Sequence, residues 1–122
     1  MTEVALVTGA GSGIGKATAV LLASRGYMVG VLGHTEAEIA VTAQEIRARG
    51  GEAILLRADI SSENEMRKAV DDLVGKAGRL DVVVANAGVN GVWAPIDDLT
   101  LEEWNRTIAI NLTGTFLTML PA

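Results

Sequence analysis

The sequence predicts an α/β protein, a doubly wound parallel sheet with helices on both faces. Four short apolar runs alternate with four segments whose apolar residues recur at helical spacing. The runs are continuously apolar, which is expected of strands that are buried on both faces. Right-handed crossovers between such strands predict the order 3-2-1-4, in a single domain that spans residues 1–122.

The first half of the predicted fold consists of two strand–helix pairs. The first strand is Val4 to Val7, and the helix after it ends at the basic residue and glycine Arg25-Gly26. The second strand is Met28 to Leu32. Thr35 to Glu38 has the pattern of a capping box, and the helix that it starts ends at Arg49-Gly50. We expect the first helix to bury an apolar arc that consists of Ile14, Ala17, Val20, Leu21 and Leu22.

The second half repeats this alternation. Ala53 to Leu56 is the third predicted strand. Ser62 to Glu65 is a second capping box, and its helix ends at Lys76 to Gly78. Val82 to Ala85 is the fourth strand. After a loop rich in Gly, Asn and Pro, Thr100 to Glu103 caps a fourth helix that runs to the end of the chain.

The turn after the first strand has the composition of a phosphate site. It reads Thr8-Gly9-Ala10-Gly11-Ser12-Gly13-Ile14-Gly15 and opens into a helix, so glycines and helical N–H groups can both approach an anion. A side chain at Gly15 would push the helix away from the strand, and Ser12 can donate to a phosphate or cap the helix. The G-x-G-x-x-G fingerprint fails here. The P-loop pattern also fails, because Ala10 and Ala17 replace its first glycine and its hydroxyl residue.

Composition and charge exclude several classes of protein. The net charge is −5 with interleaved signs, which argues against a nucleic-acid partner. No cysteine is present, so disulfides and thiolate zinc sites are excluded, and we predict no metal site. The chain start lacks a signal-peptide pattern, and the uncharged run Val82 to Ile96 is too short to cross a bilayer. We therefore expect a cytoplasmic protein without a membrane partner.

Three motifs together make the chain similar to the short-chain dehydrogenase/reductase (SDR) family. The turn fits T-G-x-x-x-G-x-G, Asp59 follows the third strand, and the motif N-A-G follows the fourth. The resemblance implies a Rossmann-type fold and a nicotinamide dinucleotide at the carboxyl ends of the strands. The cofactor-binding residues that it implies are Gly9, Ser12, Gly13, Ile14, Gly15, Gly33, His34, Thr35, Asp59, Ile60, Asn86, Ala87 and Gly88.

The resemblance also assigns roles at the ends of the third and fourth strands. In the family, an acid at the position of Asp59 accepts from the adenine amino group, and the aliphatic Ile60 packs on the ring. The alternative is that Asp59 is a turn residue before a capped helix. The amide of Asn86 is suited to tie the chain after the fourth strand to neighbouring backbone, and Gly88 permits close approach of the cofactor.

The choice of cofactor depends on the segment after the second strand. An NAD-specific site usually places an acid here for the ribose 2′-hydroxyl. Gly33-His34-Thr35 has none, which slightly favours NADP(H) over NAD(H). The alternative is that His34 is a solvated loop residue and that Thr35 is simply an N-cap.

Asn111 lies between apolar neighbours in the last predicted helix, where asparagine is unfavourable. In the family this position is the catalytic tetrad's asparagine, whose backbone helps to hold a water linked to a lysine. The alternative is a structural asparagine that kinks the helix. The family's serine, tyrosine and lysine are not found, because the one tyrosine is Tyr27 and Val31 stands four residues later. We therefore expect this chain to be the cofactor-binding half of a longer enzyme.

Two functions remain open. The first is an NAD(P)-dependent oxidoreductase that transfers hydride between nicotinamide and a small-molecule carbonyl or alcohol, with its tyrosine and lysine outside these residues. The second is a non-catalytic dinucleotide-binding module. The resemblance further implies a homo-oligomer, a dimer or tetramer, with the last helix in the subunit interface. Val92, Trp93 and Pro95 are candidates for the substrate pocket, and Trp93 either lines that pocket or covers the core.

Overall fold

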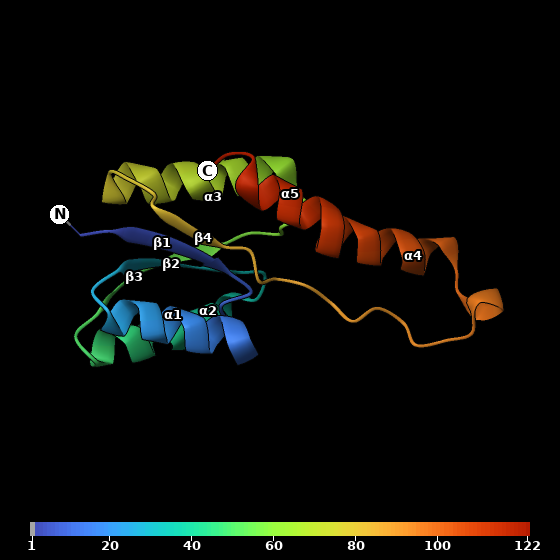
Figure 1. The fold of residues 1–122 in the computed structure, drawn as a ribbon, viewed down its shortest axis with the longest axis horizontal. Coiled ribbons are helices and arrows are strands. Elements are labelled where there is room, and N and C mark those ends of the chain that lie inside the picture. The colour runs from blue at the N-terminus through green and yellow to red at the C-terminus, as the bar shows by residue number, and fades with distance from the viewer. Residues whose placement is uncertain (1) are drawn as a thin grey trace.

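The computed structural model describes residues 2–122 and contains a four-stranded parallel sheet with helices on both faces (Figure 1). The sheet order is β3-β2-β1-β4, as predicted. Neighbouring strands are parallel, and Leu6 in β1 pairs with Gly30 in β2 and Val83 in β4. The strands are β1 (Val4–Thr8), β2 (Met28–Gly33), β3 (Glu52–Arg57) and β4 (Val82–Val84).

The helices divide between the two faces of the sheet. In Figure 1, α1 (Gly13–Ser24) and α2 (Glu36–Ala48) cover one face, whereas α3 (Glu63–Ala77) and the end of the C-terminal helical segment cover the other. Within residues 2–122, no helix has the length and apolar character that crossing a membrane requires. The C-terminal part consists of a short 3-10 turn (Ile96–Asp98), α4 (Leu101–Ile108), a π-helical segment (Ala109–Thr113) and α5 (Gly114–Met119).

Two core clusters explain why the strands are continuously apolar. On one face, Leu6 packs with α3 side chains such as Leu73, both fully buried. On the other face, Val7 packs with Ile39 and Ile46 of α2. Successive strand residues thus enter opposite clusters, and neither face of the sheet needs polar side chains.

The predicted apolar arc of α1 is wrong in part: Val20 and Leu22 are partly buried and pack against the core, whereas the other three residues do not. Ile14 and Leu21 are 78% and 54% exposed, and Ala17 is exposed as well. The buried positions of this helix are instead Gly15 and Ala19. Small residues at the centre of the buried side let the helix backbone approach the sheet closely.

The three predicted capping boxes have different outcomes. Thr100 and Glu103 form the complete box, with Glu103 N donating to Thr100 Oγ1 over 3.1 Å. Ser62 Oγ accepts from Glu65 N, but the Glu65 carboxylate bonds to the preceding turn instead of closing the box. Thr35 makes no side-chain cap, so the box predicted there is wrong. The backbone N–H of residue 38, which the Thr35 hydroxyl would have capped, donates instead to the Thr35 carbonyl, and Thr35 is exposed.

Candidate functional site

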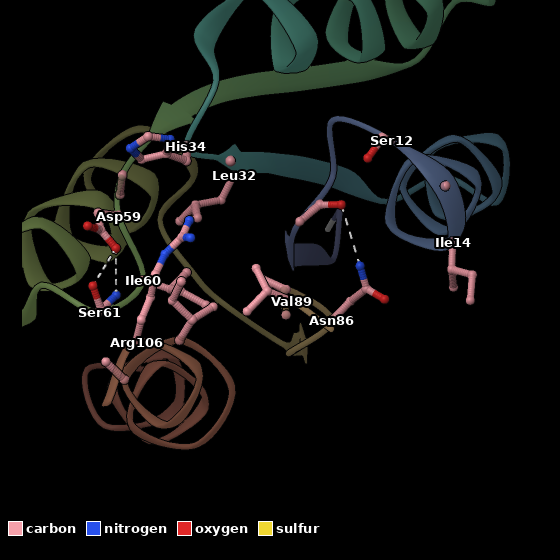
Figure 2. A pocket seen from close by; sticks show the side chains of 18 residues that line it. Ser12, Ile14, Leu32, His34, Asp59, Ile60, Ser61, Asn86, Val89 and Arg106 are labelled. Atoms are coloured by element: carbon pink, nitrogen blue, oxygen red, sulfur yellow. Dashed lines mark hydrogen bonds between the residues drawn. The ribbon is translucent and has the colours of Figure 1, made fainter. Parts of the chain in front are cut away.

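A cavity of approximately 690 Å³ opens at the carboxyl ends of the strands (Figure 2). This is the switch point between β1 and β4 at which doubly wound sheets bind ligands. Of the described residues predicted for the site, Gly15, Thr35 and Asn111 lie outside the lining. The predicted residues that line the cavity are Gly9, Ser12, Gly13, Ile14, Gly33, His34, Asp59, Ile60, Asn86, Ala87 and Gly88.

The glycine turn after β1 forms one end of the cavity. Gly9 and Gly13 have φ values of +62° and +55°, a region that residues with a Cβ adopt at a cost. The first bond of α1 joins Lys16 N to Ser12 O over 3.1 Å, so the amides of residues 13–15 precede the helical ladder. Ser12 makes no side-chain cap bond, and its exposed hydroxyl faces the cavity (Figure 2). Amides and hydroxyl together form an anion-binding arrangement.

Gly15 shapes this end of the cavity through packing. A Cβ at this position would collide with the carbonyl oxygen of Gly9 and lie 2.5 Å from Asn86 Nδ2. At Gly15 the start of α1 thus packs closely against the glycine turn and against the segment after β4, and not only against β1. Any larger residue would displace the amides that face the cavity.

Two buried hydroxyl groups hold the turn in place, and neither role was predicted from the sequence. The Thr42 hydroxyl on α2 donates to Ala10 O over 2.9 Å, and Thr42 is fully buried. Thr8 Oγ1 accepts from Asn86 N and Ala87 N, each over 3.0 Å. Asn86 Nδ2 in turn donates to Thr8 O over 3.2 Å, which is the predicted link from Asn86 to neighbouring backbone. These bonds fix the turn relative to the segment after β4.

The other end of the cavity carries the carboxylate of Asp59. Its Oδ1 accepts from the Oγ and N of Ser61, over 2.6 Å and 2.9 Å. These two bonds, with the charges of His34 and Arg57 as smaller contributions, hold the pKa of Asp59 below its usual value, against the effect of burial. Asp59 is thus a turn residue, as in the alternative interpretation, and at the same time an ionised acceptor on the cavity wall.

The segment after β2 reaches the cavity only in part. Gly33 lines it, and a Cβ there would lie 2.5 Å from Cγ2 of the buried Ile39, so packing also requires a glycine. His34 is exposed on the rim, and its carbonyl oxygen accepts from Arg57 Nε over 3.3 Å. Thr35 is exposed at the start of α2 and does not reach the lining.

Comparison with known families assigns this architecture. The family model for short chain dehydrogenases matches residues 3–121. The chain belongs to the short chain dehydrogenase family. It is 44% identical over 115 residues to a probable tetrahydroxynaphthalene reductase of Zymoseptoria tritici, covering 93% of this chain and 43% of that protein. The chain spans about half the length of the curated relatives that it matches.

Solved structures of short chain dehydrogenases superimpose closely. A 3-ketoacyl-ACP reductase from Sinorhizobium meliloti 1021 is 63% identical with a TM-score of 0.94, and the match covers 96% of this chain and 46% of that one. A metagenomic short-chain oxidoreductase in complex with NADP is 34% identical, with a TM-score of 0.93 and coverage of 98% and 54%. An NAD⁺-bound xylitol dehydrogenase is also 34% identical, with a TM-score of 0.94 and coverage of 98% and 46%.

Asn111, which was predicted to be the asparagine of the catalytic tetrad, lies in the π-helical segment, and such segments are frequent at functional sites. Its Oδ1 accepts from Val89 N and its Nδ2 donates to Val89 O, both over 2.7 Å. Its carbonyl accepts from Thr115 Oγ1 over 2.9 Å. The side chain therefore closes the loop after β4 onto the helix, and a Cβ at Gly88 would lie 3.1 Å from Asn111 Oδ1.

The structure also places two aromatic residues of this short chain dehydrogenase, and it adds two cavity residues that the sequence did not indicate. Trp93 is 91% exposed, so it does not cover the core, and a place in the substrate pocket stays a prediction. Tyr27 packs against the core cluster next to the start of β2, at the opposite end of the strands from the cavity. Arg106 and Ile110 line the cavity from the C-terminal helical segment, and only their i, i+4 spacing on a predicted helix could have indicated a shared face.

Proposed function

We propose that the full-length protein is an NAD(P)-dependent oxidoreductase that acts on a small-molecule carbonyl or alcohol. The observation that supports this best is the turn at Gly9 and Gly13, which presents the amides of α1 to one end of the cavity. The lack of a side chain at Gly15 lets the start of α1 pack against Gly9 O and Asn86, which keeps the amides of α1 beside the turn. When bound, a nicotinamide dinucleotide supplies the hydride chemistry.

Each end of the cavity receives a role in this proposal. The amides of residues 13–15, with the Ser12 hydroxyl, hold the pyrophosphate. The ionised Asp59 accepts from the adenine amino group through the carboxylate oxygen not bonded to Ser61, and Ile60 packs on the ring. The residues proposed to complete the binding surface are Gly9, Gly33, His34, Thr35, Asn86, Ala87 and Gly88.

The proton donor has to come from another part of the protein. The tyrosine of this chain, Tyr27, lies at the amino ends of the strands, so it does not face the cavity. We therefore place the tyrosine and lysine of the family outside residues 1–122. Through its two bonds to the backbone of Val89, Asn111 holds the loop after β4 beside the cavity. It thereby acts as a positioning residue for the proton path.

Binding and turnover of the full-length protein test this proposal. Reduced dinucleotide should bind, and its oxidation should follow addition of carbonyl substrates from a panel. Tight binding without turnover of any substrate would instead support a non-catalytic dinucleotide-binding module. Failure to bind either dinucleotide would exclude both functions.

The cofactor preference that we propose is NADP(H) at least as strongly as NAD(H). No carboxylate of Gly33-His34-Thr35 repels a 2′-phosphate. Gly33→Asp is a poor test because its Cβ would press on Ile39. His34→Glu, on the exposed rim, should lower the affinity for NADPH relative to NADH. A parent protein that binds NADH about tenfold more tightly, or about 1.4 kcal/mol, would contradict this preference.

We also propose that the protein acts as a cytoplasmic homo-oligomer. Leu112, Phe116 and Met119 in the C-terminal helical segment are 55–66% exposed. Apolar groups clustered on one segment favour association with another surface. Sedimentation of the full-length protein should therefore show a dimer or tetramer, and a monomer at all concentrations would contradict this assignment.

A further inference from the structure

One cation in the cavity has no place in the proposed function so far. Arg106 is the one lysine or arginine among the described residues that line the cavity. Figure 2 shows its side chain extending from the C-terminal helix toward Leu32, away from Ser12 and Ile14. The guanidinium therefore lies at the end of the cavity that carries Asp59, not at the phosphate turn.

Four of the six other arginines are held by a carboxylate. Arg49, Arg57, Arg67 and Arg79 each pair with a carboxylate. Within the part of the chain that the structure describes, Arg106 forms no such ion pair. Its guanidinium is thus available to a ligand in the cavity.

We propose that Arg106 stacks its guanidinium on the adenine ring of the bound dinucleotide. This inference rests on the proposed function. Asp59 offers an acceptor for the edge of the purine, whereas the ring faces need flat or apolar partners. Arg106 and Ile110 project from one face of the helix toward this end of the cavity, one helical turn apart. A planar, weakly hydrated guanidinium is suited to a base face, and nucleobases are commonly bound in this way.

Stacking and charge make different predictions for substitutions at Arg106. Lysine keeps the charge but loses the plane, whereas tyrosine keeps a plane without the charge. Stacking on a flat side chain contributes about fivefold or more to affinity per base. In the proposed function the pyrophosphate lies at the opposite end of the cavity. The positive charge of Arg106 should therefore contribute less to dinucleotide affinity than its planar guanidinium group does.

The test measures dissociation constants of NADH and NADPH for the full-length protein by nicotinamide fluorescence. Arg106→Gln and Arg106→Lys should each weaken both cofactors by about fivefold, and Arg106→Tyr should stay within about twofold of the parent. Arg67→Gln, on the exposed face of α3 and paired with Glu63, is the matched control and should change neither constant. Thermal melts by circular dichroism identify any variant that fails to fold.

Three results would overturn stacking in a parent protein that binds the dinucleotides. Parent-like binding by Arg106→Lys with loss in Arg106→Tyr would assign the effect to charge. A loss confined to NADPH would assign it to the 2′-phosphate. Unchanged binding in Arg106→Gln would exclude contact altogether. A parent protein that binds neither dinucleotide would instead refute the proposed function, and the inference would fail with it.

Discussion

Replacing Thr8 by valine should loosen the segment after β4 without changing the shape of the core. Thr8 is 1% exposed, and valine has nearly its volume. The hydroxyl accepts from Asn86 N and Ala87 N and donates to Val84 O over 3.5 Å, so the substitution removes all three bonds. Asn86 N keeps a second acceptor, Val84 O, at 3.0 Å. The loss therefore falls mainly on the Ala87 amide.

The magnitude follows from the cost of an unpaired amide. Leaving a buried donor without a partner costs about 1–3 kcal/mol. Because Ala87 is only partly buried, we expect the lower part of this range, about 1–2 kcal/mol. That is a substantial fraction of the roughly 5–15 kcal/mol that stabilise a typical domain.

Amide hydrogen exchange of the full-length protein provides the assay. Protection of the Ala87 amide should fall by about 5- to 30-fold in Thr8→Val, corresponding to the expected loss of about 1–2 kcal/mol. Thr8→Ser keeps the acceptor and should retain most of the protection. If Thr8→Val exchanges at residue 87 as slowly as the parent, the Thr8 hydroxyl does not hold this segment, and the reasoning is refuted.

Two further predictions concern the turn at Asp59 and the asparagine of the last helix. Ser61→Ala removes the hydroxyl that contributes most to the low pKa of Asp59, so NMR titration should show that pKa rising toward its usual value; an unchanged pKa would contradict the hydrogen bond. A carboxyl whose pKa is lower in the folded than in the unfolded protein stabilises the fold above its unfolded pKa of about 3.9, and this stabilisation is lost as the pH falls through the folded pKa. Ser61→Ala should therefore be less stable than the parent at pH 7. It should also lose less stability than the parent on acidification. Asn111→Leu removes both bonds to Val89, so it should lower turnover and increase exchange of the Val89 amide, while dinucleotide affinity remains close to the parent value.

The sequence predicted the sheet because its signals were local and consistent. Continuous apolar strands required two covered faces, and the clusters around Leu6 and Val7 provide them. The sequence also predicted that position 15 must lack a side chain, because a turn that leads directly into a helix leaves little space between the two. The predicted site residues after the strands follow from the same topology, because parallel strands end at one edge.

The errors arose where two patterns competed or where contacts are distant in sequence. In helix α1 the sequence alone placed the large residues Ile14 and Leu21 on the buried side, whereas close packing buries the small residues Gly15 and Ala19. The bonds of Thr8 and Thr42 span 78 and 32 residues, so no local pattern identifies them. Arg106 joins the cavity only because the C-terminal helix returns to the sheet, which depends on tertiary packing.

The central claim is that the glycine turn binds the phosphates of a dinucleotide, and one comparison tests it directly. Gly15→Ala places a Cβ against Gly9 O, whereas Gly75→Ala in α3 places one in open space. NADH and NADPH titrations of the two full-length variants should show affinity weakened at least about tenfold for Gly15→Ala, or about 1.4 kcal/mol, and unchanged for Gly75→Ala. A folded Gly15→Ala protein that binds both dinucleotides as tightly as the parent would contradict the claim.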